Sequence, residues 1–419
     1  MLVYYVLFGL MALLAWPLCY RRPSSAKSTV YVTVIFLYLF ALASLRYNIG
    51  SDYFTYYNIY MQIAAIPPGQ LFAVDLGEYL GAYIEMGYVL FNRYFALLGA
   101  GPQMFYAGAS VFCLLPAAFI IRRYSPNIPL SVWLYVALFC FSSTMDFVRQ
   151  NMGLAVALWG YPFLRRGGWG NVLKFMGFVA AGMTFHMTVG ILLFLAPLRQ
   201  LPFRRWVAGA YLLVTVPVFL FSRELLLWFL EDLLPALNFS LRFSRYADSI
   251  YMNPMRIDMA ALPLLILILL LVLRKPLQAR YPETDVHIHL AVWSVIFWLF
   301  AAHHMILARF YIHTVVFAVL AAPMALELYR PDPALAGEKR RLQALAEQGD
   351  REAEAALPEV REQLAVERSI YAWFLAGCAV LSFLYFLYGA LSGMEMRGHE
   401  GMYICFPYES IIPWLNQLP

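Results

Sequence analysis

Long runs of apolar residues, separated by short polar stretches, repeat along most of the chain. Two of the clearest, Met259–Leu273 and Val292–Ala302, contain no ionisable side chain. A helix needs about 20 largely apolar residues to cross a bilayer, and fewer where aromatic or polar residues anchor its ends. Residues Met1–Tyr20 have neither a basic start nor a small-residue cleavage site, so we expect a first span rather than a cleaved signal peptide. The pattern predicts an all-α, polytopic transmembrane helical protein.

The amino-acid composition supports this interpretation. Hydrophobic residues make up 62% of the chain and charged residues 13%, whereas soluble domains carry about 25% charged residues. Aromatic residues reach 17%, as expected where Tyr and Trp occupy the membrane–water interface. The five cysteines lack the spacing of metal ligands and mostly lie in apolar runs, which predicts packing roles.

Basic loops set the expected orientation, because short loops rich in Lys and Arg remain in the cytoplasm. The expected cytoplasmic loops are Arg21–Lys27, Arg122–Pro129, Arg165–Lys174, Arg199–Arg205 and Arg274–Arg280. A longer stretch, Glu327–Arg368, is the most densely charged part of the chain, and we expect a charged cytoplasmic helical insertion over 327–368 that acts as a solvated spacer. Residues 1–326 and 369–419 are then expected to form a single transmembrane domain.

Two segments do not fit single membrane crossings. Tyr83–Leu98 is short and carries Arg93 near its centre, and burying that charge in a bilayer costs roughly a few kcal/mol. Val172–Leu198 starts and ends beside basic residues, which one crossing cannot satisfy, so we expect two short helices that meet near His186, or a re-entrant hairpin. Such breaks are tolerated where the backbone lines a polar cavity, which we place on the outer side.

Candidate functional residues gather on the side that this topology places outside. The sharpest pattern is the string Arg46-Tyr47-Asn48-Ile49-Gly50-Ser51-Asp52-Tyr53, in which Gly50 allows a tight turn and an ionised Asp52 needs a cation or a substrate to compensate it. An Arg46–Asp52 pair that only caps the loop is the alternative interpretation. The other outer candidates are Glu85, Arg149, Gln150, His186, Arg242, Arg245, Tyr246 and Arg309.

The outer arginines need an explanation, because the positive-inside rule disfavours them there. A single interfacial arginine usually extends to lipid headgroups, and a lone histidine is more often a hydrogen-bonded packing residue. As a group, however, guanidinium groups bind phosphate oxygens bidentately and stay charged in a poorly hydrated site. The cluster is therefore suited to the diphosphate of a lipid carrier.

Motifs of several other enzyme classes are missing from the sequence. The chain contains no Walker A loop, no Rossmann glycine pattern, no HExxH and no GxSxG. ATP-driven transport and metalloprotease chemistry therefore lack support, and no basic stripe indicates nucleic-acid binding. No metal site and no cofactor is expected.

The string from Arg46 to Tyr53, with Tyr56 or Tyr57 behind it, resembles the RYxxGxDYxxY signature of the EpsG family. Those proteins are Wzy-like polymerases of exopolysaccharide and O-antigen repeat units. Further segments are similar to the family's motifs in the same order: Glu85-Met86-Gly87-Tyr88, Arg149-Gln150 with Ala155, Phe185-His186-Met187-Thr188 with Thr188 in place of the usual serine, Arg309-Phe310-Tyr311 and Pro407-Tyr408-Glu409-Ser410. The 327–368 insertion departs from the family pattern.

The resemblance implies a glycosyltransferase with a GT-C-like architecture, about 10 to 13 helices and short re-entrant or interfacial segments. Its implied substrate is an oligosaccharide repeat unit on undecaprenyl diphosphate, handled at the periplasmic face of the bacterial inner membrane without a metal or cofactor. The implied partners are this lipid-linked oligosaccharide and membrane lipid, with a chain-length regulator protein as a candidate and no nucleic acid.

In that reaction, an acceptor hydroxyl attacks the anomeric carbon while lipid diphosphate leaves, so a general base and cationic groups are needed. We expect Asp52 to be the base, with Glu85 and His186 as rivals. The tyrosines of the first motif either stack on sugars or anchor the interface. The expected substrate-binding residues are Arg46, Tyr53, Tyr57, Arg149, Gln150, Arg242, Arg245, Tyr246 and Arg309.

Three alternative functions remain open. An O-antigen ligase would use the same carrier and similar outer arginines, so only an acceptor assay separates it from a polymerase. A transporter of lipid-linked sugars predicts polar residues along several spans, whereas here they concentrate at the outer boundary. A structural partner in a polysaccharide synthesis complex predicts that the polymer is unchanged after mutation of the outer arginines.

Overall fold

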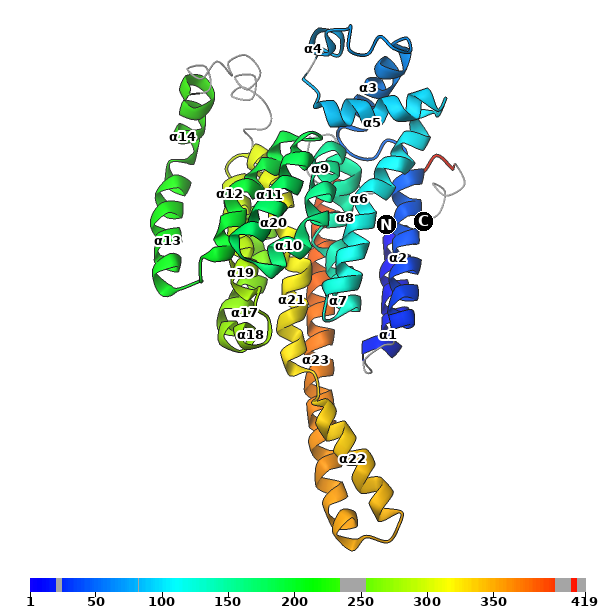
Figure 1. The fold of residues 1–419 in the computed structure, drawn as a ribbon, viewed down its shortest axis with the longest axis vertical. Helices are drawn as coiled ribbons and strands as arrows, with labels where there is room; N and C mark the ends of the chain where they lie inside the picture. The colour runs from blue at the N-terminus through cyan, green and yellow to red at the C-terminus, as the bar shows by residue number, and fades with distance from the viewer. Residues whose placement is uncertain (20–24, 82, 234–253, 396–407, 413–419) are drawn as a thin grey trace.

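The computed structural model describes residues 1–19, 25–81, 83–233, 254–395 and 408–412. Over these residues the protein is helical, with one isolated bridge between Arg46 and Ser410 and no longer strand. Figure 1 shows a bundle of helices with a cap of short helices at one end and a long helical hairpin at the other. The expected all-α class is confirmed.

The part of the chain before residue 201 supplies the cap and about half of the bundle. Its helices are α1 (Leu2–Cys19), α2 (Ser25–Leu45), α3 (Tyr53–Ala65), α4 (Leu76–Tyr79), α5 (Met86–Leu97), α6 (Pro102–Tyr124), α7 (Ile128–Ala137), α8 (Cys140–Asp146), α9 (Val148–Trp159), α10 (Tyr161–Arg166), α11 (Trp169–Met183), η1 (Met187–Gly190), α12 (Ile191–Leu195) and η2 (Ala196–Gln200). The cap consists of α3, α4 and α5 (Figure 1).

The rest of the chain completes the bundle and forms the hairpin. Its helices are α13 (Arg205–Leu220), α14 (Ser222–Trp228), η3 (Phe229–Leu233), η6 (Ile257–Ala260), α17 (Ala261–Val272), α18 (Arg274–Arg280), α19 (Thr284–Ala301), η7 (Met305–Leu307), α20 (Ala308–Val315), α21 (Ala318–Leu326), η8 (Glu327–Tyr329), α22 (Pro333–Ala346) and α23 (Arg351–Glu395).

Several helices of the described chain are long and apolar enough to cross a membrane. Four pass by themselves, namely α2, α6, α19 and the Arg351–Ser392 part of α23. Four pairs of helices pass together but bend by more than 40° at a short break, which gives up to eight spans. This number is lower than the expected 10 to 13 membrane helices, because many of the apolar runs are divided into shorter helices. The polytopic helical membrane class is nevertheless confirmed.

The first irregular segment, Tyr83–Leu98, contains α5, a helix of 12 residues in the cap. Arg93 is 7% exposed, and its guanidinium donates to the carbonyl oxygens of Ile63 and Ile66 at 3.1 and 2.6 Å. These carbonyls lie at the C-terminal end of α3, where a cation is stabilising. The charge that would be costly in a bilayer therefore joins α5 to α3.

The second irregular segment, Val172–Leu198, is also broken, as the sequence predicted. Helix α11 ends at Met183 and the helical path resumes at Met187, with His186 in the break. The break contacts the start of α5, because the Gly87 amide donates to the Thr184 carbonyl oxygen at 2.8 Å. A Cβ atom at position 87 would lie 2.7 Å from that oxygen, so only glycine allows this approach. The contact holds the cap against the bundle.

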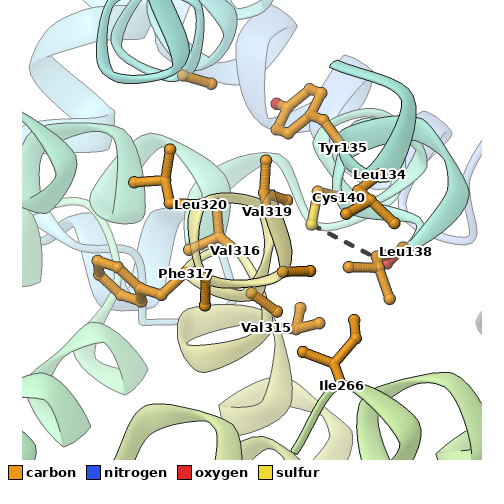
Figure 2. Packing of buried hydrophobic residues seen from close by; sticks show 14 of the residues in the cluster. Leu134, Tyr135, Leu138, Cys140, Ile266, Val315, Val316, Phe317, Val319 and Leu320 are labelled. Carbon is orange, nitrogen blue, oxygen red and sulfur yellow. Dashed lines mark hydrogen bonds between the residues drawn. The ribbon is translucent and has the colours of Figure 1, made fainter. Parts of the chain in front are cut away.

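The centre of the bundle is apolar. Figure 2 shows Leu134 and Leu138 from the α7 region beside the α20–α21 segment that carries Val315 and Val319, with Ile266 of α17 below. All five side chains are buried. Close packing of this kind leaves little freedom for helix shifts. It therefore fixes the positions of α8 and α20, whose ends carry polar residues.

The charged segment 327–368 consists mainly of helix. Helix α22 and the first part of α23 form a hairpin that projects from the bundle (Figure 1). Its buried residues Ala353, Leu357, Val360 and Leu364 recur at the spacing of one helix face. Helix α23 runs unbroken for 45 residues, through the expected boundary at residue 368, so the hairpin and the bundle share one helix.

Candidate functional site

The candidate residues of the described chain flank helix ends that meet near the cap, opposite the α22 hairpin (Figure 1). Arg46 follows α2, Asp52 precedes α3, Glu85 precedes α5, Arg149 lies in the first turn of α9, His186 precedes η1 and Arg309 lies in the first turn of α20. Helix ends leave backbone N–H and C=O groups without intrahelical partners, and polar side chains often satisfy these groups. The same end therefore gathers polar side chains from six elements.

The turn of the first motif is fixed by a buried carboxylate. The amide and hydroxyl of Ser51 both donate to Asp146 Oδ1, at 2.7 and 2.8 Å. Gly50 has φ +95°, and a Cβ atom there would lie 2.7 Å from the Met145 carbonyl oxygen and 2.9 Å from the Asp146 Cα. Asp146 is 1% exposed, and its Oδ2 accepts no hydrogen bond within the described chain. The turn before Asp52 is thus held directly on the end of α8.

Arg46 is deeply buried at 1% exposure. Its guanidinium lies 4.6 Å from the centre of the Tyr106 ring, a cation–π arrangement. Its backbone forms the bridge with Ser410, and the Tyr47 amide donates to the Glu409 carbonyl oxygen at 3.0 Å. The first and last motifs are therefore neighbours. This burial supports a packing role for Arg46 more than contact with a substrate.

Asp52 is half-buried at the start of α3. The Tyr56 hydroxyl donates to Asp52 Oδ2 at 3.4 Å. Burial raises the pKa of Tyr56 well above its usual value, and the Asp52 carboxylate raises that pKa further. Tyr56 therefore stays protonated and acts as a donor to Asp52. The positive charge of Arg149 acts in the opposite direction and lowers the pKa of Tyr56, so Tyr56 interacts electrostatically with both Asp52 and Arg149.

The other tyrosines of the first motif differ in accessibility. Tyr53 is 4% exposed and stacks on Tyr106 at 4.8 Å between ring centres with 15° between the planes. Tyr57 is 38% exposed. A ring needs a free face to stack on a sugar, so Tyr57 is better placed than Tyr53 to bind substrate.

Glu85 joins three elements. Its Oε2 pairs with Arg149 Nη1 at 2.9 Å, and its Oε1 accepts from the Met187 amide at 3.1 Å. The Arg149 guanidinium carbon also lies 5.9 Å from the centre of the Tyr88 ring. The Arg149 side chain is 21% exposed and the Glu85 side chain 7%. Glu85 therefore orients Arg149, and Arg149 keeps the larger accessible surface.

His186 begins a chain of hydrogen bonds that leads into the bundle. Its Nδ1 lies 2.8 Å from Thr188 Oγ1, which lies 2.9 Å from Nε2 of the fully buried His313. Burial lowers the pKa of His186 well below its usual value, and the charges of Arg149 and Arg309 lower it further. His186 is therefore neutral at neutral pH.

Some predicted residues contribute less to this geometry. Gln150 is 3% exposed, and its Oε1 accepts no hydrogen bond among the residues described. Arg242, Arg245 and Tyr246 fall in 234–253 and lie outside the described residues. In the described part of the chain, no three His, Cys, Asp or Glu side chains converge in a way that could hold a metal ion.

Two residues that the sequence did not single out belong to the cluster. Asp146 lies three positions before Arg149, at the end of an apolar segment, and an acidic residue in such a segment is a general indicator of function. His313 lies four positions after Arg309, which places both on one face of α20. Those two spacings are the signals that could have identified them.

A small internal cavity lies deeper in the bundle. The residues that line it belong to the stretch from α6 to α9 and to α20 and the residue after it, and none of them is charged. They are Cys113, Tyr135, Leu138, Phe139, Cys140, Ser143, Asn151, Leu154, Ala155, Leu158, Tyr311, Ile312, Val315 and Val316. A diphosphate group requires cationic partners. The anionic chemistry therefore belongs to the polar cluster and not to this cavity.

The family comparison agrees with the arrangement of these motifs. The EpsG family model matches residues 29–333, a range that includes Asp52, Glu85, Arg149, His186 and Arg309. No curated protein and no solved structure gives a significant match to the chain. The family match covers well over half of the chain and confirms the resemblance seen in the sequence motifs. This protein therefore belongs to the EpsG family, a family of Wzy-like polymerases.

Proposed function

We propose that this protein is a membrane glycosyltransferase that polymerises undecaprenyl-diphosphate-linked oligosaccharide repeat units at the periplasmic face of the bacterial inner membrane. The observation that carries the proposal is the polar cluster at one end of an EpsG-family bundle, where Glu85 joins Arg149 to the amide of Met187 beside His186, and where Asp52 contacts Tyr56. It combines an accessible carboxylate with cationic groups, which are the two chemical requirements of glycosyl transfer from a diphosphate.

The proposed reaction joins two lipid-linked units. The oxygen of an acceptor sugar hydroxyl bonds to the anomeric carbon of the donor glycan, and the bond from that carbon to the diphosphate oxygen breaks. The hydroxyl proton moves to a base, and the electron pair of the broken bond leaves with the lipid diphosphate. A base placed within hydrogen-bond reach typically contributes about 10²–10⁴-fold to such a step.

Asp52 is the best-placed base of the three candidates. Both oxygens of Glu85 are engaged, one by Arg149 and one by the Met187 amide. Asp52 is half-buried, and the contact of its carboxylate with Tyr56 is long at 3.4 Å. A weakly held carboxylate can turn toward an incoming hydroxyl with little loss of existing bonds. Glu85 is better suited to hold Arg149 in place.

Arg149 and Arg309 are the proposed diphosphate ligands. Both act electrostatically on His186, and Arg149 retains exposed surface beyond its ion pair. Negative charge builds up on the leaving diphosphate in the transition state, and cations held in place beforehand stabilise it without reorganisation. Removal of one such group typically costs about 10²–10³-fold in rate.

The distribution of the remaining basic residues supports the proposed orientation. Arg165 pairs with Glu283 at 2.6 Å, and Arg280 donates to the carbonyl oxygen of Glu327, where the α22 hairpin starts. These loops therefore meet at the hairpin end, opposite the cap. Because basic loops stay in the cytoplasm, this end is assigned to the cytoplasm and the cluster to the periplasm.

The test is polymerisation by the purified full-length protein in lipid nanodiscs, with a lipid-linked repeat unit as the only substrate and product length as the readout. Asp52→Asn is expected to slow polymerisation by about 10²-fold or more. Asp75→Asn is the matched control, because Asp75 is an exposed helix N-cap in the same cap and asparagine also caps helices.

Normal polymerisation by folded Asp52→Asn protein would rule out Asp52 as the base. Transfer of glycan to lipid A core without growth of the lipid-linked chain would show that the protein is a ligase. Wild-type polymer length after substitution of both Arg149 and Arg309 by glutamine would contradict the proposed diphosphate site.

A further inference from the structure

The hydrogen bonds around Thr188 determine where His186 carries its proton. The Thr188 backbone amide, which can only donate, points to His186 Nδ1 at 3.3 Å. Nδ1 must then carry its lone pair, and the single proton of the neutral imidazole is on Nε2. The shorter contact of 2.8 Å between Nδ1 and Thr188 Oγ1 is consequently a bond donated by the hydroxyl.

The hydroxyl of Thr188 has only one proton, which it donates to His186. In its contact with His313, the hydroxyl must therefore be the acceptor. The Thr188 oxygen must accept from His313 Nε2, which lies 2.9 Å away. His313 therefore carries its proton on Nε2 and has a bare Nδ1, in agreement with the finding that this buried Nδ1 receives no hydrogen bond within the described chain. The hydrogen bonds are therefore all donated in one direction, from His313 to Thr188 and from Thr188 to His186.

This direction changes the chemistry available at His186. A neutral imidazole whose Nδ1 accepts a hydrogen bond presents an N–H group at Nε2, so it cannot take a proton there. Glu85 holds Arg149 beside His186, because it pairs with Arg149 at 2.9 Å and accepts from the amide of Met187, the next residue in the chain, at 3.1 Å. The guanidinium groups of Arg149 and Arg309 are donors only. An imidazole N–H group beside guanidinium donors is suited to bind an anion with several oxygen atoms.

We propose that His186 donates its Nε2–H to the diphosphate of the lipid-linked substrate, and that Thr188 and His313 are positioning residues that hold His186 in this tautomer. The inference rests on the proposed function for the identity of the anion, whereas the tautomer itself is a property of the protein without substrate. It removes His186 from the candidate bases and adds it to the diphosphate ligands beside Arg149 and Arg309.

Two pairs of variants test the proposed hydrogen bonds from His313 to Thr188 and from Thr188 to His186. Thr188→Val removes the hydroxyl at nearly constant volume, whereas Thr188→Ser keeps it. His313→Leu removes the donor, whereas His313→Gln places an amide N–H near the position of the lost Nε2–H. The control is His287→Gln, because His287 is another buried histidine whose Nε2 lies 3.0 Å from a hydroxyl, that of Tyr161.

The decisive measurement is ¹⁵N NMR of histidine-labelled full-length protein in nanodiscs, with the His186 signals assigned by comparison with His186→Gln. The seven histidines make this assignment practicable. In the wild type and in the Thr188→Ser, His313→Gln and His287→Gln variants, His186 is expected to be the neutral Nε2–H tautomer. Thr188→Val and His313→Leu are expected to give a mixture of tautomers.

Polymerisation gives the second readout. Thr188→Val and His313→Leu are expected to lose about 10²-fold in rate, while Thr188→Ser, His313→Gln and the His287→Gln control stay near the wild-type rate. A wild-type His186 protonated on Nδ1, or an unchanged tautomer in folded His313→Leu, would overturn the proposed chain. If the tautomers follow the expectation but inorganic pyrophosphate leaves the His186 signal unmoved, the anion contact fails. Since neither NMR result requires glycosyl transfer, failure of the proposed polymerase activity would be recognised separately.

Discussion

The contact between Gly50 and α8 leads to a sharp prediction for the Gly50→Ala substitution. At φ +95° an alanine is strained, and left-handed backbone costs a non-glycine residue roughly 1–2 kcal/mol. The new Cβ would also lie 2.7 Å from the Met145 carbonyl oxygen, whereas ordinary contact begins at 3.4 Å. The Met145 carbonyl oxygen and the Asp146 Cα, which would lie 2.9 Å from the new Cβ, are both backbone atoms of α8. They cannot turn aside as a side chain could, so the turn at Gly50 must move away from α8.

That movement stretches the two hydrogen bonds from Ser51 to Asp146, now 2.7 and 2.8 Å long. An intramolecular hydrogen bond contributes about 0.5–1.5 kcal/mol. With the backbone strain, the free energy of unfolding is expected to fall by about 2–5 kcal/mol. Asp52 follows this turn directly, and a displacement of a reacting group by about 1 Å can cost about 10²-fold in rate.

Gly69→Ala is the matched control for this prediction. Gly69 also has a positive φ, +82°, but a Cβ atom there meets nothing within 4 Å. It therefore measures the cost of backbone strain alone, about 1–2 kcal/mol. Denaturant unfolding and the polymerisation assay would be run on both variants. Equal losses of stability in the two variants, or a wild-type polymerisation rate for Gly50→Ala, would refute the contact-based reasoning.

Three further predictions follow from the site and its orientation. Glu85→Gln is expected to lower the free energy of unfolding by about 1.5–3 kcal/mol, because it removes the charge that pairs with Arg149 at 2.9 Å; an unchanged unfolding curve would contradict this. In a cysteine-free background, a membrane-impermeant maleimide added to spheroplasts is expected to label Gln70→Cys in the cap and not Gly349→Cys at the hairpin tip, and the reverse result would invert the proposed topology. Since the pKa of His186 is lowered in the folded protein, the unfolded state binds more protons below about pH 6.5. Acidification through that range should therefore destabilise the wild type more than the His186→Gln variant, as followed by thermal unfolding.

Much of the architecture could be predicted from the sequence because the bilayer imposes a local constraint. Each spanning segment must be apolar over about 20 residues and satisfy its own backbone hydrogen bonds, so composition and hydropathy identify the class. The same constraint exposed the breaks in Tyr83–Leu98 and Val172–Leu198, where charge or loop position conflicted with a single crossing. It also drew attention to Asp52, Glu85 and His186, since polar residues at membrane boundaries are conspicuous.

The contacts that give those residues their roles depend on helix packing, which hydropathy does not encode. Ser51 and Asp146 are 95 positions apart, and Thr188 and His313 are 125 positions apart. An isolated Asp or His in an apolar stretch indicates that a partner exists without naming it, because any of several helices could supply it. By itself, the sequence determined that this is a polytopic membrane protein with polar residues at its helix ends. Only the tertiary structure decided which helices meet there, and hence that Asp146 holds the Asp52 turn and that His313 faces Thr188.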